Sequence, residues 1–297
     1  MKMSNRLFHR TSVIWICCLL LLTGCAARIP NSKYELLQES TSSLLTTTEN
    51  TYARIEKLQR RFAVTTAAGA EINRNSFKPL IAGQSYDLTP ELRFREAALE
   101  VLVDYVNVLC AFSTKDYLKN VDKATLRLGA GLRDLFRSSQ LLTTPEDFRV
   151  TGIFASLINK MTREIVKQEK RVALKQAMDL AQNDIEELSK LIEKSNSKIK
   201  MSIGVMLAPL INHANEVRPP VKTLERIPFD MEVAEVIAEA EAIEASLESI
   251  NAAMTKIPLA HKEIRNDLDR IQSAFDSLQE LAREVRRSQK YYRSLKD

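Results

Sequence analysis

The apolar residues of this 297-residue chain recur at alternating intervals of three and four positions over long stretches, and this spacing most constrains the fold. Between residues 243 and 278 the pattern is typical of helices that pack as coiled coils. With seven glycines and nine prolines, the chain carries few of the residues that interrupt helices. The sequence therefore predicts an all-α fold, an elongated antiparallel bundle built from coiled-coil-like hairpins of long helices.

Helix boundaries follow from N-cap residues, prolines and the ends of the apolar stripes. Thr89-Pro90 and Thr144-Pro145 each place a proline at the first helical position after an N-cap residue, and Pro258 is expected to kink or break the last rod. We expect one elongated domain over 34–297, with helices over about 34–73, 91–112, 115–142, 146–208, 230–257 and 259–295. The fourth helix is expected to fold back on the last two. The second and third form either a hairpin or one kinked rod.

The first 24 residues differ chemically from the rest of the chain. Lys2, Arg6 and Arg10 precede a ten-residue apolar run, 13–22, which is well short of the roughly 20 residues that cross a bilayer as a helix. The segment therefore has the order of a targeting signal, and we do not expect it to be part of the fold.

The four residues that end this segment are Leu22, Thr23, Gly24 and Cys25. They resemble a lipobox, in which the cysteine of a bacterial lipoprotein receives a diacylglycerol before the signal peptide is cleaved. The resemblance implies that residues 1–24 are a cleaved signal peptide, that Cys25 is lipidated and that residues 25–33 form a short tether. An ordinary cleaved signal peptide and an uncleaved anchor with a free thiol are the alternatives.

The same resemblance implies where the protein is held. In lipoproteins of Gram-negative bacteria, an Asp after the lipidated cysteine favours the inner membrane, and this chain has Ala26 there. We therefore expect a cell-envelope location, lipid-anchored in the outer membrane and facing the periplasm. The membrane, reached through the lipid on Cys25, is the first expected partner.

The composition and the motifs indicate neither nucleic-acid binding nor enzymatic chemistry. The leader removes three of 43 basic residues, which leaves a net charge of only about +2. His213 and His261 are too few for a metal or triad site, and His261 occupies a seam position, so we expect no enzyme and no cofactor. Cys110 is expected to be a small core residue. The glycines of Leu128-Gly129-Ala130-Gly131-Leu132 are expected to permit close helix approach or a bend.

Two charge features stand out from this background. Residues 230–255 contain acidic residues and no basic one, and we expect Glu244 and Glu248 to face Lys198 and Lys200. The C-terminal helix carries a basic set that forms either an ordinary solvated helix end or a docking patch for an anionic surface. This set is Arg283, Arg286, Arg287, Lys290, Arg293 and Lys296. Its end is expected to approach the basic residues of 160–170.

An extended helical body with a lipid anchor supplies reach and surface rather than a catalytic pocket. We therefore expect a non-enzymatic structural or adaptor protein of the envelope, with a protein partner there. One alternative is a ligand-binding bundle, a sensor or carrier, whose cavity lies between the second and third helices under the 77–88 loop. Another is a pore-forming type of protein, for which the apolar run 201–211 is short.

Overall fold

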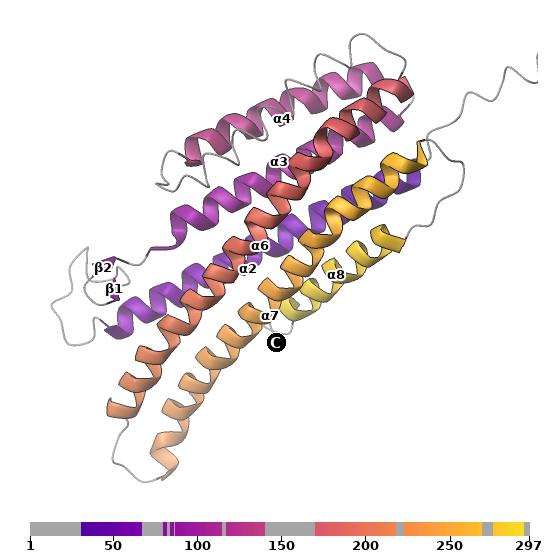
Figure 1. Cartoon of the computed structure of the whole chain (residues 1–297). Coiled ribbons are helices and arrows are strands. Elements are labelled where there is room, and N and C mark those ends of the chain that lie inside the picture. The colour runs from indigo at the N-terminus through magenta and orange to yellow at the C-terminus, as the bar shows by residue number, and fades with distance from the viewer. Residues whose placement is uncertain are drawn as a thin grey trace, which may run out of the picture. The chain divides into compact units, whose positions relative to one another are not determined.

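The computed structural model confirms the all-α fold (Figure 1). Apart from two two-residue strands, β1 (Leu80–Ile81) and β2 (Gln84–Ser85), which pair antiparallel, the described chain is helical. The structure describes residues 31–66, 80–81, 84–85, 87–114, 117–139, 170–217, 223–268 and 276–293.

Helix α2 (Asn31–Thr66) contacts four other helices of the bundle. It packs on α3 (Thr89–Ser113), α6 (Lys170–Val217), α7 (Thr223–Asp267) and α8 (Asp276–Arg293). The apolar stripe of this helix is buried, and it consists of Leu37, Leu44, Ile55, Leu58 and Phe62. Because α2 already begins at Asn31, the predicted tether is wrong for residues 31–33. Lys33 is buried there and forms an ion pair with Asp267 of α7.

Helices α3 and α4 (Tyr117–Ser139) form a hairpin, which decides between the two predicted arrangements (Figure 1). Helix α3 begins at Thr89, so Leu88 rather than Thr89 is its N-cap residue, and the helix starts two residues before the predicted boundary. The backbone N–H of Thr89 donates to Asp87 Oδ1 at 2.9 Å. Helix α3 ends where Thr114 adopts an extended conformation.

Helices α6 and α7 form a second antiparallel hairpin. Lys200 pairs with Glu248, Asn196 Nδ2 donates to Asn251 Oδ1 at 2.9 Å, and Arg265 pairs with Asp179 farther along. The Lys200–Glu248 pair confirms one predicted contact between the basic residues of α6 and the acidic run of α7. Complementary charge therefore accounts for part of that acidic run.

Pro258 does not end a helix at residue 257, and this corrects the predicted boundary. Helix α7 continues through Pro258 to Asp267 with Ile257, Ala260 and Ile264 all buried. An internal proline costs about 3 kcal/mol in helix stability. Burial of the apolar stripe on both sides of the proline outweighs that cost.

The predicted helix 259–295 is likewise wrong, because its two halves belong to different helices. A turn at Leu268 ends α7, and α8 packs back along α7, with Ser249 Oγ donating to the Glu284 carbonyl at 3.1 Å. The apolar repeat thus continues from one helix into its antiparallel neighbour. Helix α6 also passes its proline, Pro209, and ends at Val217 rather than at 208. Residues 67–73, 115–116, 140–142, 146–169, 269–275 and 294–295 of the predicted helices lie outside the described residues.

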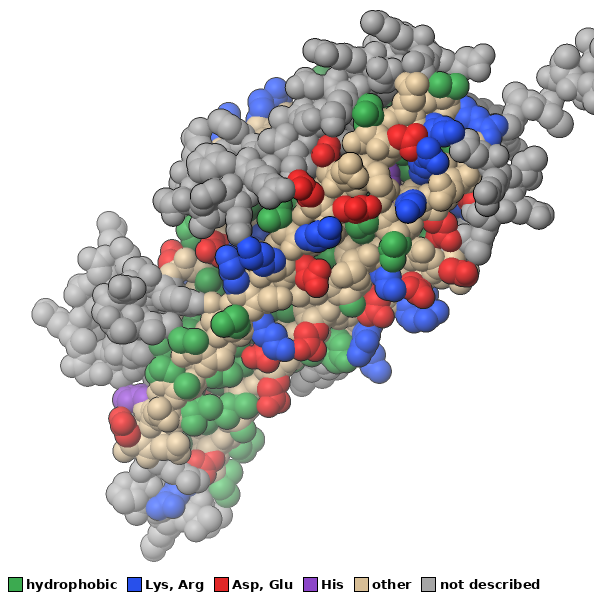
Figure 2. Space-filling model, viewed as in Figure 1, with side chains coloured by type: hydrophobic (Ala, Val, Ile, Leu, Met, Phe, Trp, Pro, Cys, Tyr) green, Lys and Arg blue, Asp and Glu red, His purple; other side chains and the backbone are tan. Residues whose placement is uncertain are grey.

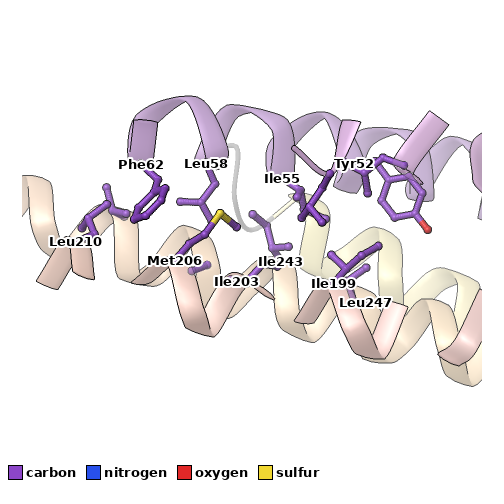
Figure 3. Close-up of a cluster of buried hydrophobic side chains, with 14 residues drawn as sticks. Tyr52, Ile55, Leu58, Phe62, Ile199, Ile203, Met206, Leu210, Ile243 and Leu247 are labelled. Atoms are coloured by element: carbon purple, nitrogen blue, oxygen red, sulfur yellow. The ribbon is translucent and has the colours of Figure 1, made fainter. Parts of the chain in front are cut away.

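One apolar cluster joins α2, α3, α6 and α7 (Figure 3). Phe62 of α2 lies against Met206 and Leu210 of α6, while Ile243 and Leu247 contribute from α7. A buried polar contact continues this core, because the Tyr52 hydroxyl donates to Asn196 Oδ1 at 2.7 Å. The core therefore runs along α2, α6 and α7 toward the end of the bundle where α6 stops and α7 begins.

Candidate functional site

The predicted lipidation site, Cys25 with Leu22, Thr23 and Gly24, lies outside the described residues and stays a prediction. Within the part of the chain that the structure describes, no helix combines the length and the hydropathy that a membrane crossing requires.

The predicted basic set lies on α8. Arg283, Arg286, Arg287, Lys290 and Arg293 are exposed, and Lys296 is outside the described residues. Arg287 lies 3.8 Å from Glu284, and its guanidinium carbon is 5.9 Å from the Tyr291 ring centroid. Docking on an anionic surface stays a prediction for this set.

The predicted approach of these cations to the basic residues of 160–170 can be compared with the structure only at Lys170, the first residue of α6, and there it does not fit the helix register. Ser288 of α8 lies beside Ser246 in the middle of α7, whereas Arg171 of α6 hydrogen-bonds the Leu268 carbonyl at the far end of α7. The reversal of the chain before α8 is the reason. Residues 160–169 themselves lie outside the described residues.

The exposed face of α6 changes character at Met201. Before it, this face carries Lys190, Lys194 and Lys198, and after it no residue from 201 to 215 is acidic, Lys or Arg. We call the exposed residues after the change the uncharged face, and they are Met201, Gly204, Val205, Ala208 and Pro209. Met201 is 73% exposed, and an added Cβ at Gly204 would meet no atom within 4 Å.

Apolar side chains also gather over the adjoining end of α7 (Figure 2). Ile227 and Met231 are 45% and 57% exposed there. Farther along α7 the exposed side chains include three carboxylates, Glu232, Glu235 and Glu241. An exposed apolar surface rimmed by polar groups marks a binding surface more often than an ordinary monomer surface does.

A charged cluster joins α2 to α7 next to this end of the bundle. Glu239 is 8% exposed, and its carboxylate receives the Arg61 guanidinium at 2.9 Å, with Arg54 at 3.8 Å and Lys57 at 4.0 Å. Three cations thus surround one buried carboxylate. A buried carboxylate requires such partners, because desolvation otherwise penalises the charge.

A pocket of about 380 Å³ opens beside this cluster, between α2, α6 and α7. Its basic side consists of Lys57, Arg60 and Arg61 of α2 and faces Glu232 of α7. The remaining lining residues are Val64, Leu210, His213, Ala214, Val233 and Val236. Leu210 and Val236 belong to the apolar cluster of Figure 3, so the pocket continues the core.

His261, for which the sequence predicts a seam position, is 1% exposed. It lies where α3, α6 and α7 meet. The Tyr105 hydroxyl lies 2.7 Å from its Nε2, and Gln182 Oε1 lies 2.8 Å from its Nδ1. Burial lowers the pKa of His261 to about 3, and the Asp179 carboxylate opposes this shift only in part. The ring is therefore a neutral structural link between α3, α6 and α7 at ordinary pH.

Cys110 and the two glycines of the 128–132 segment have surroundings that concern packing rather than chemistry. Cys110 is half-buried rather than a full core residue, and its thiol donates to Gln38 Oε1 at 3.3 Å. An added Cβ at Gly131 would lie 3.3 Å from Val101 Cγ2, so Gly131 permits close approach of α4 to α3. An added Cβ at Gly129 would meet nothing within 4 Å. Among the described residues, no group of three or more His, Cys, Asp or Glu side chains has metal-binding geometry.

A second pocket, of about 490 Å³, lies between α2, α3 and α4, near the predicted ligand cavity. Several of its lining side chains are polar, and two of them are joined, since Gln38 Nε2 donates to Asn107 Oδ1 at 2.7 Å. It lies by the C-terminal end of α3, whereas the 77–88 loop precedes the N-terminal end. This pocket is therefore not the cavity predicted under that loop.

The sequence reasoning missed the basic wall of the α2–α6–α7 pocket. Lys57, Arg60 and Arg61 lie within five residues, at intervals that place them on one side of a helix. Val64 continues this side one turn later. A scan for cations at spacings of three and four beside an apolar stripe would have found them.

Comparisons with protein-family models, with curated proteins and with solved structures found no match to this chain.

Proposed function

We propose that this chain is a lipid-anchored, non-enzymatic adaptor of the bacterial cell envelope. In this proposal Cys25 holds it to the outer membrane, and the helical bundle binds a protein partner in the periplasm. The observation that carries the adaptor role is the uncharged face of α6, an exposed helix surface without a charged side chain.

The chemistry of this face favours a helix of another protein as the partner. Gly204 and Ala208 are one turn apart, and the absence of bulk there permits close approach of a second backbone. Met201 and Val205 supply apolar contact area on either side. Glu244 of α7 lines one pocket with Met201, and a carboxylate beside this face disfavours an anionic lipid surface.

A photoreactive amino acid placed on α6 tests this role in intact cells. Introduced at Met201 or Val205, it should yield one discrete, ultraviolet-dependent crosslinked species that a Gly204→Arg change abolishes. Lys190 lies on the same exposed face of α6, before the uncharged face begins, and is the matched control position. Equal crosslinking from Lys190 and Met201, or none from Met201 and Val205, would refute an adaptor that acts through this face.

A second candidate function, ligand binding, is favoured by the pocket between α2, α6 and α7. The α6 residues that line this pocket are Leu210, His213 and Ala214. None of them belongs to the uncharged face. The two candidate roles therefore use different side chains and can be tested separately.

A further inference from the structure

We propose that the α2–α6–α7 pocket binds a single-chain amphiphile with a carboxylate head, of the fatty-acid class. This site goes beyond the adaptor role, because none of the residues of the uncharged face lines the pocket. The proposal rests on the position of cations and apolar side chains around one cavity.

The lining of the pocket contains more cationic than acidic side chains. Among the lining residues, Lys57, Arg60 and Arg61 face one carboxylate, Glu232. Including the adjoining pair of Arg54 and Glu239 leaves the same excess of positive charge. Since an excess positive charge attracts an anion, the pocket is suited to a negatively charged ligand.

Guanidinium groups match a carboxylate head in geometry as well as in charge. Two of the three lining cations are arginines, and a guanidinium donates two parallel hydrogen bonds to a carboxylate. Arg60 is exposed, so its side chain can reach a head group at the mouth of the pocket. Binding of the head there leaves the tail directed at the apolar walls.

The apolar walls suit one hydrocarbon chain. Val64 is 53% exposed on α2, while Leu210 of α6 and Val236 of α7 are 6% and 7% exposed and lead into the core. Covering Val64 and filling the space above Leu210 removes apolar surface from water, which favours binding by roughly 25 cal/mol per Å². A volume of about 380 Å³ is at the small end of ligand pockets, which suits a single chain better than a two-chain lipid.

Photolabelling of the full chain in phosphatidylcholine nanodiscs tests the proposal. The probe is a twelve-carbon carboxylic acid with a diazirine near the end of its tail. We expect label on Val64, Val233 or Val236, identified by mass spectrometry of peptides. Unlabelled dodecanoate should compete, whereas dodecanol, with the same tail and no charge, should compete about tenfold less.

Charge variants distinguish a head-group site from adsorption to an apolar surface. Lys57→Gln with Arg60→Gln should weaken competition by dodecanoate about tenfold and leave that of dodecanol unchanged. Both side chains are exposed enough for the fold to tolerate the change, which circular dichroism checks. Lys119→Gln with Arg133→Gln, on exposed positions of α4, is the matched control and should behave as wild type.

Three results would overturn the proposal. These are equal competition by dodecanoate and dodecanol, unchanged competition in the Lys57 and Arg60 variant, and label confined to Met201 and Val205. The crosslinking experiment on the uncharged face does not depend on this outcome, so the failure of one proposal is distinguishable from the failure of the other.

Discussion

The Tyr105 hydroxyl and His261 Nε2 lie 2.7 Å apart, and this contact joins α3 to α7 inside the bundle. The Gln182 oxygen can only accept, so Nδ1 of His261 carries the proton and Nε2 accepts from the Tyr105 hydroxyl. Gln182 Nε2 in turn donates to the carbonyl of Pro258 at 3.2 Å. One hydrogen-bonded chain thus fixes the register of three helices where α7 passes a proline.

The lowered pKa of His261 predicts a pH-dependent stability. Its pKa is about 3 in the folded protein and about 6.5 in the unfolded chain, so between these values the unfolded state binds more protons. This contribution to stability is complete above pH 6.5 and is lost as the pH falls toward 3, at up to about 1.4 kcal/mol per pH unit. Urea unfolding at pH 7.5, 6.5, 5.5 and 4.5 measures it.

The contribution of His261 is the difference in the free energy of unfolding between wild type and a His261→Gln variant at each pH. This comparison is necessary because the pKa of Glu96 is also shifted. Burial raises it most, repulsion by Glu49, Glu56 and Glu100 adds to the shift, and the pKa reaches about 7. That shift acts in the opposite direction, since its stabilising effect is lost as the pH rises from 4.5 to 7. Parallel pH profiles for wild type and His261→Gln would contradict a buried neutral imidazole.

The core cluster predicts a sharp contrast between two positions two residues apart on α6. Ile203 is buried in the cluster, whereas Met201 is 73% exposed. Ile203→Ala should lower the free energy of unfolding by about 2 to 5 kcal/mol through lost burial and cavity formation, and Met201→Ala by less than about 0.5 kcal/mol. Chemical denaturation of both variants checks this, and similar losses for the two would place α6 in a different rotation.

The two glycines of α4 predict a second contrast. Gly129→Ala should raise the free energy of unfolding by about 0.5 to 1 kcal/mol, because alanine favours a helix and its Cβ meets open space. At Gly131 the same gain is opposed by Val101 Cγ2 at 3.3 Å and Asp104 Oδ2 at 3.2 Å from the added Cβ. Thermal unfolding should therefore rank Gly129→Ala above Gly131→Ala, and equal stabilisation would show that α4 does not pack closely on α3 at Gly131.

The helical fold could be predicted from the sequence because apolar spacing decides which face of a helix is buried. Ile55 and Phe62 of α2 and Leu247 of α7 lie on apolar stripes that are visible in the sequence, and all three are buried. The course of the chain at Pro258 could not be predicted, because local propensity favours a break there. Only the packing on both sides of the proline, including the Gln182 contact with its carbonyl, reveals the continuous helix.

The candidate sites were less predictable than the fold. The apolar run at 201–211 was visible in the sequence, but its exposure depends on which side of α6 faces α2 and α7. The pocket combines residues from three helices that are up to 179 positions apart, from Lys57 to Val236. No spacing within one helix indicates that combination.

Metabolic labelling with an alkyne analogue of palmitate tests the lipid anchor, on which the proposed function depends. Wild type and Cys110→Ser, which keeps Cys25, should both carry the label and remain with the membrane fraction. Cys25→Ser should carry no label and appear in the soluble fraction. Label on the Cys25→Ser protein, or its absence from wild type, would contradict a protein anchored through Cys25.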